Sequence, residues 1–339
     1  MKKVLRLTLT SRLRVGRPEP REWPVKKAFV LGAGFGTRLR PLTEVLPKPL
    51  IPVANKPLLT YAFDLLRSAG VEEFVVNTHH LAKAYKTAFP EGRYAESPIH
   101  FVHETPEILD TGGGLANAGS HFRDDHFVVY NGDILTDLPI QKAMDAHRES
   151  GNLATLILRS GGPNRNAALD PKTGKMVDLR NALNSDSSDL YQFTGIYIVD
   201  PEFLGFLQPN PQSVVPAFLT AIRDHNRLGG IVIDEGYWWD LGDREAYVEA
   251  NFVTLAHDFP SFEMEVPPVR IHKNSRINPD SEIDEFSIVG EGCVIGAGVV
   301  LRKSILWPGT RIAAGSRLEH CIATGVKNPV LGSYQREDL

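Results

Sequence analysis

Residues 28–52, AFVLGAGFGTRLRPLTEVLPKPLIP, decide how this chain is expected to fold. The segment begins with a short apolar run, continues as the glycine-rich GAGFGT, and then carries Arg38 and Lys48. Glycines let the backbone approach a ligand closely and turn its N–H groups toward it. Arginine offers a planar fork for phosphate oxygens, and lysine offers a point charge. The order predicts a buried strand, a phosphate-binding loop and two cations beside that loop.

Two common phosphate-binding loops do not fit this segment. A dinucleotide fingerprint GxGxxG that starts at Gly32 needs a glycine at position 37, where the chain has Thr37. The stretch roughly 20 residues further on reads VANKP and has no acidic residue to bind a ribose. The GxxxxGK[ST] pattern of a P-loop does not occur. A Rossmann oxidoreductase is therefore disfavoured, and an ordinary strand-to-helix turn remains an alternative for this loop.

The bulk composition is that of a globular protein with more than one domain. The chain has 339 residues, of which 42% are hydrophobic and 23% charged, and its net charge of -4 gives no reason to expect nucleic acid or an acidic membrane as a partner. No apolar run approaches the roughly 20 residues of a membrane span. Cys293 and Cys321 cannot form a disulfide framework, so a cytoplasmic setting is expected. The basic residues 1–25 lack the apolar core of a secretory signal and predict an N-terminal extension or a targeting arm.

Hydrophobic periodicity predicts alternating strands and helices up to residue 258, which is typical of an α/β domain. The expected strands are 28–31, 73–77, 100–104, 127–130, 153–158, 193–198 and 231–234. The expected helices are 56–70, 140–150, 213–226 and 244–257, the last with Asp243 as its N-cap. Asp133 follows a strongly apolar strand, at the kind of sheet edge where α/β proteins bind ligands.

A six-residue repeat follows the proline-rich residues 259–268, which we expect to be a linker. Branched apolar residues recur every six positions, and small residues recur four positions after them. The apolar set is Ile271, Ile277, Ile283, Val289, Ile295 and Leu301, and the small set is Ser275, Ser281, Ser287 and Cys293. Such a hexapeptide repeat predicts a parallel β-helix, of roughly three coils over residues 269–325, with residues 326–339 as a tail.

The sequences GAGFGTRLRPLT and LPKPLIPVANKPLL resemble the signature of the sugar-1-phosphate nucleotidyltransferases, or NDP-sugar pyrophosphorylases. Their pattern is roughly GxGTRLxPLT followed by PKPLxPVxxKPxL. This chain departs from the signature at one point, because many members have Ala-Ala-Gly or Gly-Gly-Gly where it has Gly32-Ala33-Gly34. The resemblance covers about residues 25–258, with residues 26–258 as the catalytic domain. It implies a Rossmann-like mixed, mostly parallel sheet flanked by helices, and a short left-handed parallel β-helix at the C-terminus.

The resemblance also implies a reaction and its residues. A nucleoside triphosphate and a sugar 1-phosphate would give an NDP-sugar and pyrophosphate, with Mg²⁺ held by Asp133 and by Asp240 of the GYWWDLG motif. Arg38 and Lys48 would be the catalytic cations. The nucleotide would contact Gly32, Ala33, Gly34, Gly36, Thr37, Arg38, Asn77, Glu104, Gly112, Gly113 and Gly114. The sugar would contact Asn166, Arg180, Thr194 and Gly195.

The substrates stay open at this point. Glu104 can only accept hydrogen bonds and would suit guanine or uracil. The DTGGG at 110–114 resembles members that act on N-acetylmuramate 1-phosphate with UTP, and a GTP-using mannose or heptose enzyme is the alternative. Many relatives carry a Glu-Lys-Pro whose lysine binds the sugar phosphate. This chain lacks it, so Arg180 or Lys48 would replace that lysine.

Other classes of protein also remain. A non-catalytic subunit that senses nucleotide sugars could keep the same fold, although Arg38, Lys48, Asp133 and Asp240 argue against it. Hexapeptide helices also occur in acyltransferases, for which His272 and His320 are the local candidates. Because stacked coils expose edges that need cover, we expect the β-helix to join copies into a homo-oligomer.

Overall fold

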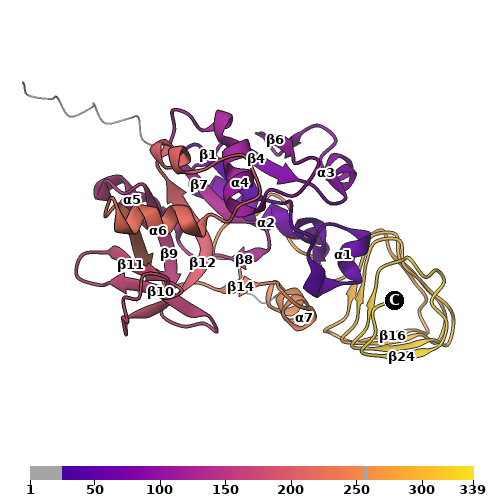
Figure 1. Ribbon diagram of the computed structural model, residues 1–339. Helices are drawn as coiled ribbons and strands as arrows, with labels where there is room; N and C mark the ends of the chain where they lie inside the picture. The colour runs from indigo at the N-terminus through magenta and orange to yellow at the C-terminus, as the bar shows by residue number, and fades with distance from the viewer. Residues whose placement is uncertain (1–24, 256–258) are drawn as a thin grey trace, which may run out of the picture.

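The computed structural model describes residues 25–255 and 259–339. They form an α/β domain followed by a β-helix (Figure 1). The predicted N-terminal extension lies outside the described residues except for Val25, and so does the predicted helix end at His257. Among the described helices, none has the length and apolar character needed to cross a membrane.

A ten-stranded mixed sheet forms the centre of the first domain, in the order β10-β11-β13-β9-β12-β7-β1-β4-β6-β5. Its strands are β1 (Lys27–Leu31), β4 (Glu73–Thr78), β5 (Arg93–Tyr94), β6 (Ser97–His103), β7 (Phe127–Asn131), β9 (Ala154–Arg159), β10 (Arg165–Asp170), β11 (Lys175–Leu179), β12 (Leu190–Val199) and β13 (Leu228–Val232). The parallel pairing is concentrated in β7-β1-β4-β6. Strand β12 runs antiparallel to both β7 and β9.

Helices cover both faces of this sheet (Figure 1). They are α1 (Leu42–Val45), α2 (Leu58–Ser68), α3 (Ala82–Ala88), α4 (Asp110–Asn117), α5 (Ile140–Ser150), α6 (Val215–Arg223) and α7 (Arg244–Val253), with the 3-10 turns η1 (Thr37–Leu39), η2 (Lys48–Leu50), η3 (Gly119–His121) and η4 (Pro201–Phe206). Strand β7 shows the two faces, because Val128 packs into the core with α2 and α5 whereas Val129 packs into the core with α4 and α6.

The predicted elements are present, and their ends differ for local reasons. Helix α5 has the predicted bounds, and Asp243 caps α7 by accepting a hydrogen bond from the Ala246 N–H. Helix α2 begins only at Leu58, because β3 (Lys56–Pro57) pairs with β2 (Pro52–Val53). Helix α6 begins at Val215 with a proline in its first turn, two residues later than expected.

The C-terminal domain is the predicted β-helix, and Figure 1 shows its three-sided coils end-on. Its faces are the sheets β15-β18-β21, β16-β19-β22-β24 and β17-β20-β23. These strands are β15 (Arg276–Ile277), β16 (Glu282–Ile283), β17 (Ile288–Val289), β18 (Val294–Ile295), β19 (Val300–Arg302), β20 (Ile305–Leu306), β21 (Arg311–Ile312), β22 (Arg317–Glu319), β23 (Ile322–Ala323) and β24 (Ser333–Gln335).

The apolar side chains of the six-residue pattern pack inside the coils. Val289, Ile295 and Leu301 are buried in one cluster, against which the earlier isoleucines of the repeat pack. The Ser275 and Ser281 hydroxyls donate to carbonyls three residues back, which closes the corners. The expected tail at 326–339 is wrong, because β24 pairs with β22 and continues the β-helix.

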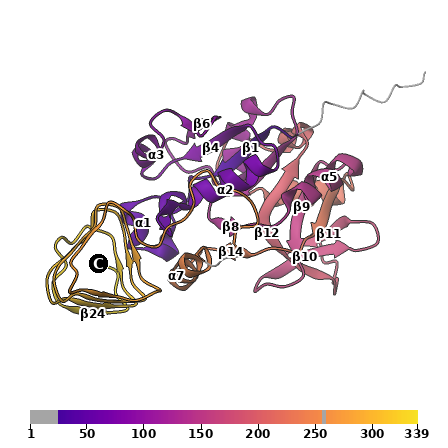
Figure 2. The same ribbon diagram turned by 180° about the vertical axis from the view of Figure 1, so that it is seen from behind.

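The predicted linker is packed rather than loose. Phe259 is buried, and the Ser261 N–H donates to Asp137. The Lys56 ammonium group, buried beside Asp64, donates to the Val266 carbonyl. Seen from behind, α1 and α7 lie between the sheet and the β-helix (Figure 2). The β-helix therefore sits against the α/β domain rather than hanging from it.

Candidate active site

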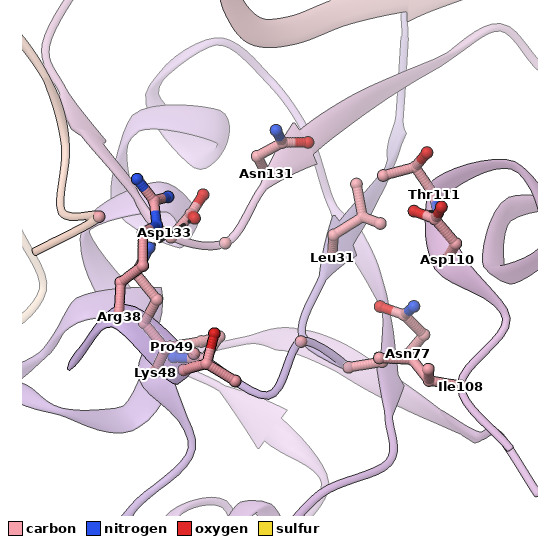
Figure 3. Close-up of a pocket in the computed structure, with 16 residues that line it drawn as sticks. Leu31, Arg38, Lys48, Pro49, Asn77, Ile108, Asp110, Thr111, Asn131 and Asp133 are labelled. Carbon is pink, nitrogen blue, oxygen red and sulfur yellow. Dashed lines mark hydrogen bonds and ion pairs between the residues drawn. The ribbon is translucent and has the colours of Figure 1, made fainter. Parts of the chain in front are cut away.

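A cavity of about 340 Å³ opens beside the carboxyl ends of β1, β4 and β7. Figure 3 shows Arg38, Lys48 and Asp133 gathered on one side of it, and Ile108, Asp110 and Thr111 on the other. Its lining consists of Leu31, Ala33, Gly34, Gly36, Thr37, Arg38, Lys48, Pro49, Asn77, Ile108, Asp110, Thr111, Asn131, Gly132, Asp133 and Gly242. The parallel strands thus bring together segments that are far apart in the sequence.

The glycine-rich loop is held by its backbone. The Gly32 N–H donates to the Asn77 Oδ1 at 2.7 Å, and the Gly32 carbonyl accepts from the Tyr85 hydroxyl at 2.8 Å. At the far end, the Thr43 hydroxyl donates to the Gly36 carbonyl. Gly32 itself does not line the cavity, so its place is to join the loop to β4.

Lys48 lies between the two predicted aspartates. Its ammonium nitrogen is 2.6 Å from Asp133 Oδ2 and 3.6 Å from Asp240 Oδ1. Arg38 is 4.0 Å from the other oxygen of Asp240. Burial and the neighbouring Asp133 raise the pKa of the Asp240 carboxyl, and Lys48 and Arg38 counteract this. Two anions and two cations therefore lie close together beside the cavity.

A short strand pair fixes the spacing of the two aspartates. Strand β14 (Trp238–Asp240) runs antiparallel to β8 (Ile134–Thr136) and sets Asp240 opposite Ile134. The Leu241 N–H then donates to the Asp133 carbonyl at 3.1 Å. Gly242 makes room for the arginine, because a Cβ there would lie 2.7 Å from the Arg38 guanidinium.

The two carboxylates suit a hard divalent cation. Mg²⁺ is commonly bound by one or two carboxylates together with substrate phosphates and water. The described residues hold no cluster of three or more His, Cys, Asp or Glu that would bind a metal alone. Asp133 and Asp240 therefore fit a cation that shares its ligands with a substrate.

Glu104 lies behind the cavity rather than in it. Its side chain is 1% exposed, one oxygen accepts from the Asn77 amide, and the other accepts from the Leu109 N–H. Because the carboxylate is buried and does not line the cavity, its expected direct contact with the base does not fit this geometry. Glu104 instead orients Asn77, which does line the cavity.

The three glycines of DTGGG also serve packing. The N–H groups of Gly112 and Gly113 donate to the Gln212 carbonyl, and Gly114 packs against Glu104. The residues just before them, Asp110 and Thr111, line the cavity instead. The sequence reading did not single these two out, although they open the motif that it quoted.

A second cavity of about 540 Å³ adjoins the first and shares Arg38 and Gly242 with it. The rest of its lining is Arg159, Gly161, Gly162, Pro163, Asn164, Gln192, Asp234, Trp238, Trp239, Asp240 and Asp243. It takes residues from β9, β12 and β14. The sequence could have suggested Asp234, because it follows β13 at the carboxyl end of a parallel strand.

The four predicted sugar-binding residues line neither cavity. Asn166 and Arg180 are exposed and bonded to each other through their backbones. Thr194 is buried, donates its hydroxyl to the Ile157 carbonyl, and accepts the Trp238 indole N–H. Thr194 therefore orients Trp238, which does line the second cavity.

Gly195 acts on the first cavity through its neighbour Asn131. Its φ of +79° belongs to the left-handed region, and a Cβ there would lie 2.6 Å from the Asn131 amide nitrogen. Glycine lets Asn131, a residue that the sequence reading passed over, lie against β12 and line the first cavity. Gly195 therefore affects the first cavity only through Asn131.

Arg159 is the other cation that lines the second cavity, and its guanidinium is used mainly in hydrogen bonds to the backbone. Its guanidinium donates to the carbonyls of Ile233, Asp234, Glu235 and Gly236 at 3.0 to 3.5 Å. The Ser160 N–H donates to Asp234 Oδ1. Of the charged side chains that line this cavity, only Arg38 lies beside both the phosphate-binding loop and Asp240.

Comparisons with known proteins show the family of this chain. A family model described as "Nucleotidyl transferase" matches residues 27–256, and one described as "GMPPB C-terminal domain" matches residues 265–333. The chain is 28% identical to a UTP--glucose-1-phosphate uridylyltransferase of Synechocystis over 72% of its own length and 67% of that protein. It is 29% identical to a mannose-1-phosphate guanylyltransferase of Mycobacterium tuberculosis, over 74% and 69% respectively.

A solved structure is similar in fold. The crystal structure of HddC from Yersinia pseudotuberculosis superposes with a TM-score of 0.56 at 21% identity, and the match covers 67% of this chain and 98% of that one.

Proposed function

We propose that this chain uses GTP and a mannose-type hexose 1-phosphate. The proposal starts from its family, because the chain belongs to the nucleotidyl transferase family and is a sugar-1-phosphate nucleotidyltransferase. The family model, the curated relatives and the solved structure confirm the predicted family, reaction class and fold class. The observation that carries the assignment of catalytic residues is the contact of Lys48 with both Asp133 and Asp240, where two cavities meet.

The proposed reaction needs binding and charge rather than a covalent intermediate. The triphosphate lies along residues 33–38, and the sugar 1-phosphate enters through the second cavity. A phosphate oxygen of the sugar attacks the α-phosphorus in line, the α–β bridging bond breaks, and pyrophosphate leaves. The attacking phosphate is already ionised, so no general base is required.

Each cation has a proposed role. Arg38 borders both cavities, so its guanidinium can stabilise the leaving pyrophosphate. Lys48 is directed at the junction, so its ammonium group can bind the α-phosphate or the incoming phosphate. Without the Glu-Lys-Pro lysine, and with Arg180 away from both cavities, Lys48 and Arg38 would share the sugar phosphate.

Asp133 and Asp240 are the proposed ligands of Mg²⁺. When bound, the metal would offset the negative charge of the two substrates and of the transferring group. The carboxylates orient it through the β8–β14 pair, which holds their backbones in register.

Asp110 is the proposed base-recognising residue, in place of Glu104. It lines the end of the first cavity opposite Lys48 (Figure 3). A carboxylate accepts hydrogen bonds and can pair with both N1–H and N2–H of guanine, whereas uracil offers a single N–H. The relative of M. tuberculosis is named for a guanylyl transfer to mannose 1-phosphate, which agrees with this choice.

UTP with N-acetylmuramate 1-phosphate, or another hexose 1-phosphate, is the second candidate. The DTGGG motif and the missing Glu-Lys-Pro favour it, and the Synechocystis relative is named for the use of UTP. We further propose that the enzyme is cytoplasmic and that its copies assemble through the β-helix. Size-exclusion chromatography with light scattering tests the assembly.

Pyrophosphate release tests the function directly. The protein would be assayed with GTP, UTP, ATP, CTP and dTTP against mannose, glucose and N-acetylmuramate 1-phosphates, with Mg²⁺. Highest kcat/KM for GTP with mannose 1-phosphate is expected. A preference for UTP would overturn the base assignment but leave the reaction class. No turnover with any pair would favour the nucleotide-sugar-sensing subunit.

A further inference from the structure

The β-helix packs against the segments that carry the catalytic groups. One buried cluster combines side chains of both domains. From the α/β domain it includes Leu39, Leu42, Leu241 and Tyr247, and from the β-helix Ile288, Ile305, Trp307 and Ile322. Leu39 directly follows Arg38, and Leu241 directly follows Asp240. The segments of Arg38 and Asp240 therefore both pack against the β-helix through this cluster.

A hydrogen-bond relay reaches the loop of Lys48. The Trp307 indole N–H donates to the Tyr247 hydroxyl at 2.9 Å. That hydroxyl donates to the Pro52 carbonyl at 2.7 Å, just beyond the PKPLI segment that contains Lys48. Trp307 and Tyr247 are both buried, so water does not compete for these bonds.

An ion pair reaches the segment of Asp240. The Asp338 carboxylate accepts a hydrogen bond from the Arg244 Nε at 2.8 Å. The same guanidinium donates to the His320 carbonyl at 2.6 Å. The pair is mostly shielded from water, with the Arg244 and Asp338 side chains 23% and 13% exposed. Arg244 begins α7, four residues after Asp240.

We propose that the β-helix is a positioning element of the active site, and that Asp338 is a positioning residue that acts through Arg244. The inference rests on the proposed function. Arg38, Lys48 and Asp240 each lie on a segment fastened to the β-helix, and Asp133 is tied to that assembly by the Leu241 N–H. All residues that line the two cavities precede Arg244, so the β-helix touches neither substrate directly.

This arrangement predicts a particular kinetic signature. Removing the Asp338 carboxylate loosens the segment of Asp240, a proposed metal ligand, but leaves Arg38, Lys48 and the base contact in place. For Asp338→Asn we expect kcat to fall about tenfold and the Mg²⁺ concentration for half-maximal rate to rise, as for residues that orient a metal ligand. The KM values for nucleotide and sugar should change by less than about twofold, because ground-state binding is kept.

Glu337→Gln is the matched control. It neutralises the neighbouring carboxylate, which is exposed and makes no ion pair in the described residues. Tyr247→Phe provides a second variant on the independent relay, and Arg244→Met combined with Asp338→Asn tests the route. The double variant should have the kcat of Arg244→Met alone.

The experiment uses the full-length chain, with every variant assayed below its measured melting temperature. A drop in kcat for Asp338→Asn and Tyr247→Phe, but not for Glu337→Gln, supports the inference. Asp338→Asn and Tyr247→Phe with lowered melting temperatures and the kcat of wild type would overturn it, because the contact would then only stabilise the fold. Inactive wild-type protein would count against the proposed function instead.

Discussion

The two cavities of the active site meet at Arg38 but are built in different ways. The first lies at the ends of the parallel strands β1, β4 and β7, and the loops that follow them supply backbone N–H groups and charges. The second lies along β9 and β12, which are antiparallel, and its lining side chains are largely bonded to nearby backbone. The first cavity thus uses features common to α/β sheets, whereas the second, which we propose binds the sugar, depends on local detail.

The first cavity should carry the largest effect. Asp133→Asn removes the charge that faces Lys48 at 2.6 Å and a proposed metal ligand. We expect kcat/KM to fall about a thousandfold, since electrostatic groups at a reacting phosphate are worth this much. Pyrophosphate release and Mn²⁺ binding by electron paramagnetic resonance would both be measured.

Asp145→Asn serves as the control for that variant, because Asp145 lies on the surface of α5 and pairs with Arg148. Asp133→Asn within about tenfold of wild type, with Mn²⁺ binding intact, would show that the carboxylate is not a metal ligand. The comparison between the two cavities would then lose its chemical basis.

Arg38→Lys should have the next largest effect. Lysine keeps the charge but loses the planar fork that can reach two phosphate oxygens. A fall in kcat of about thirtyfold is expected, with the KM for the sugar 1-phosphate raised as well because Arg38 borders both cavities. Arg40→Lys, the same change on a nearby exposed arginine, should behave as wild type. Equal rates for the two variants would count against the role of Arg38.

The first cavity was also the more predictable of the two. The strand before GAGFGT and the aspartate after β7 follow from hydrophobic pattern and from the rule that parallel sheets bind ligands at their carboxyl edge, whereas Lys48 was identified from the resemblance to the family signature. That rule fixes which loops meet. It does not reveal side-chain direction, and so Glu104 was expected at the base whereas its oxygens bind Asn77 and Leu109.

The second cavity could not be predicted in the same way. Its antiparallel strands change register between Phe193 and Tyr197, where β12 has two residues more than β9, and such an irregular stretch redirects side chains. Thr194 consequently points into the core and Gln192 lines the cavity, although both lie on β12. The β-helix could be predicted because its six-residue repeat is visible in the sequence.

Asp234→Ala examines the second cavity. Asp234 lines it and accepts the Ser160 N–H, so its loss should weaken sugar binding. We expect the KM for the sugar 1-phosphate to rise about tenfold, with kcat and the KM for the nucleotide little changed. The exposed Asp189 provides the control as Asp189→Ala. A larger change in the KM for nucleotide than for sugar would mean that the two cavities are not divided between the substrates as proposed.

The smallest effect on catalysis should come from Asp178→Asn, which changes the loop that contains Arg180. Burial acts to raise the pKa of the Asp178 carboxyl, but N–H groups of Leu183, Ser185 and Leu179 donate to it and hold the pKa below its usual value. Asparagine offers a single acceptor oxygen, so the free energy of unfolding should fall by about 1–2 kcal/mol at pH 7.

The pH dependence of that loss has a definite sign. Because the folded-state pKa is lowered, the carboxylate stabilises the fold above the unfolded pKa, and this contribution disappears as the pH falls through the folded value. Urea unfolding should therefore separate wild type from Asp178→Asn at pH 7 and bring them together in acid. The kinetic constants should not change, because the loop of residues 179–185 lines neither cavity. A raised KM for the sugar 1-phosphate in this variant would instead bring the loop, and Arg180 within it, back into the sugar site.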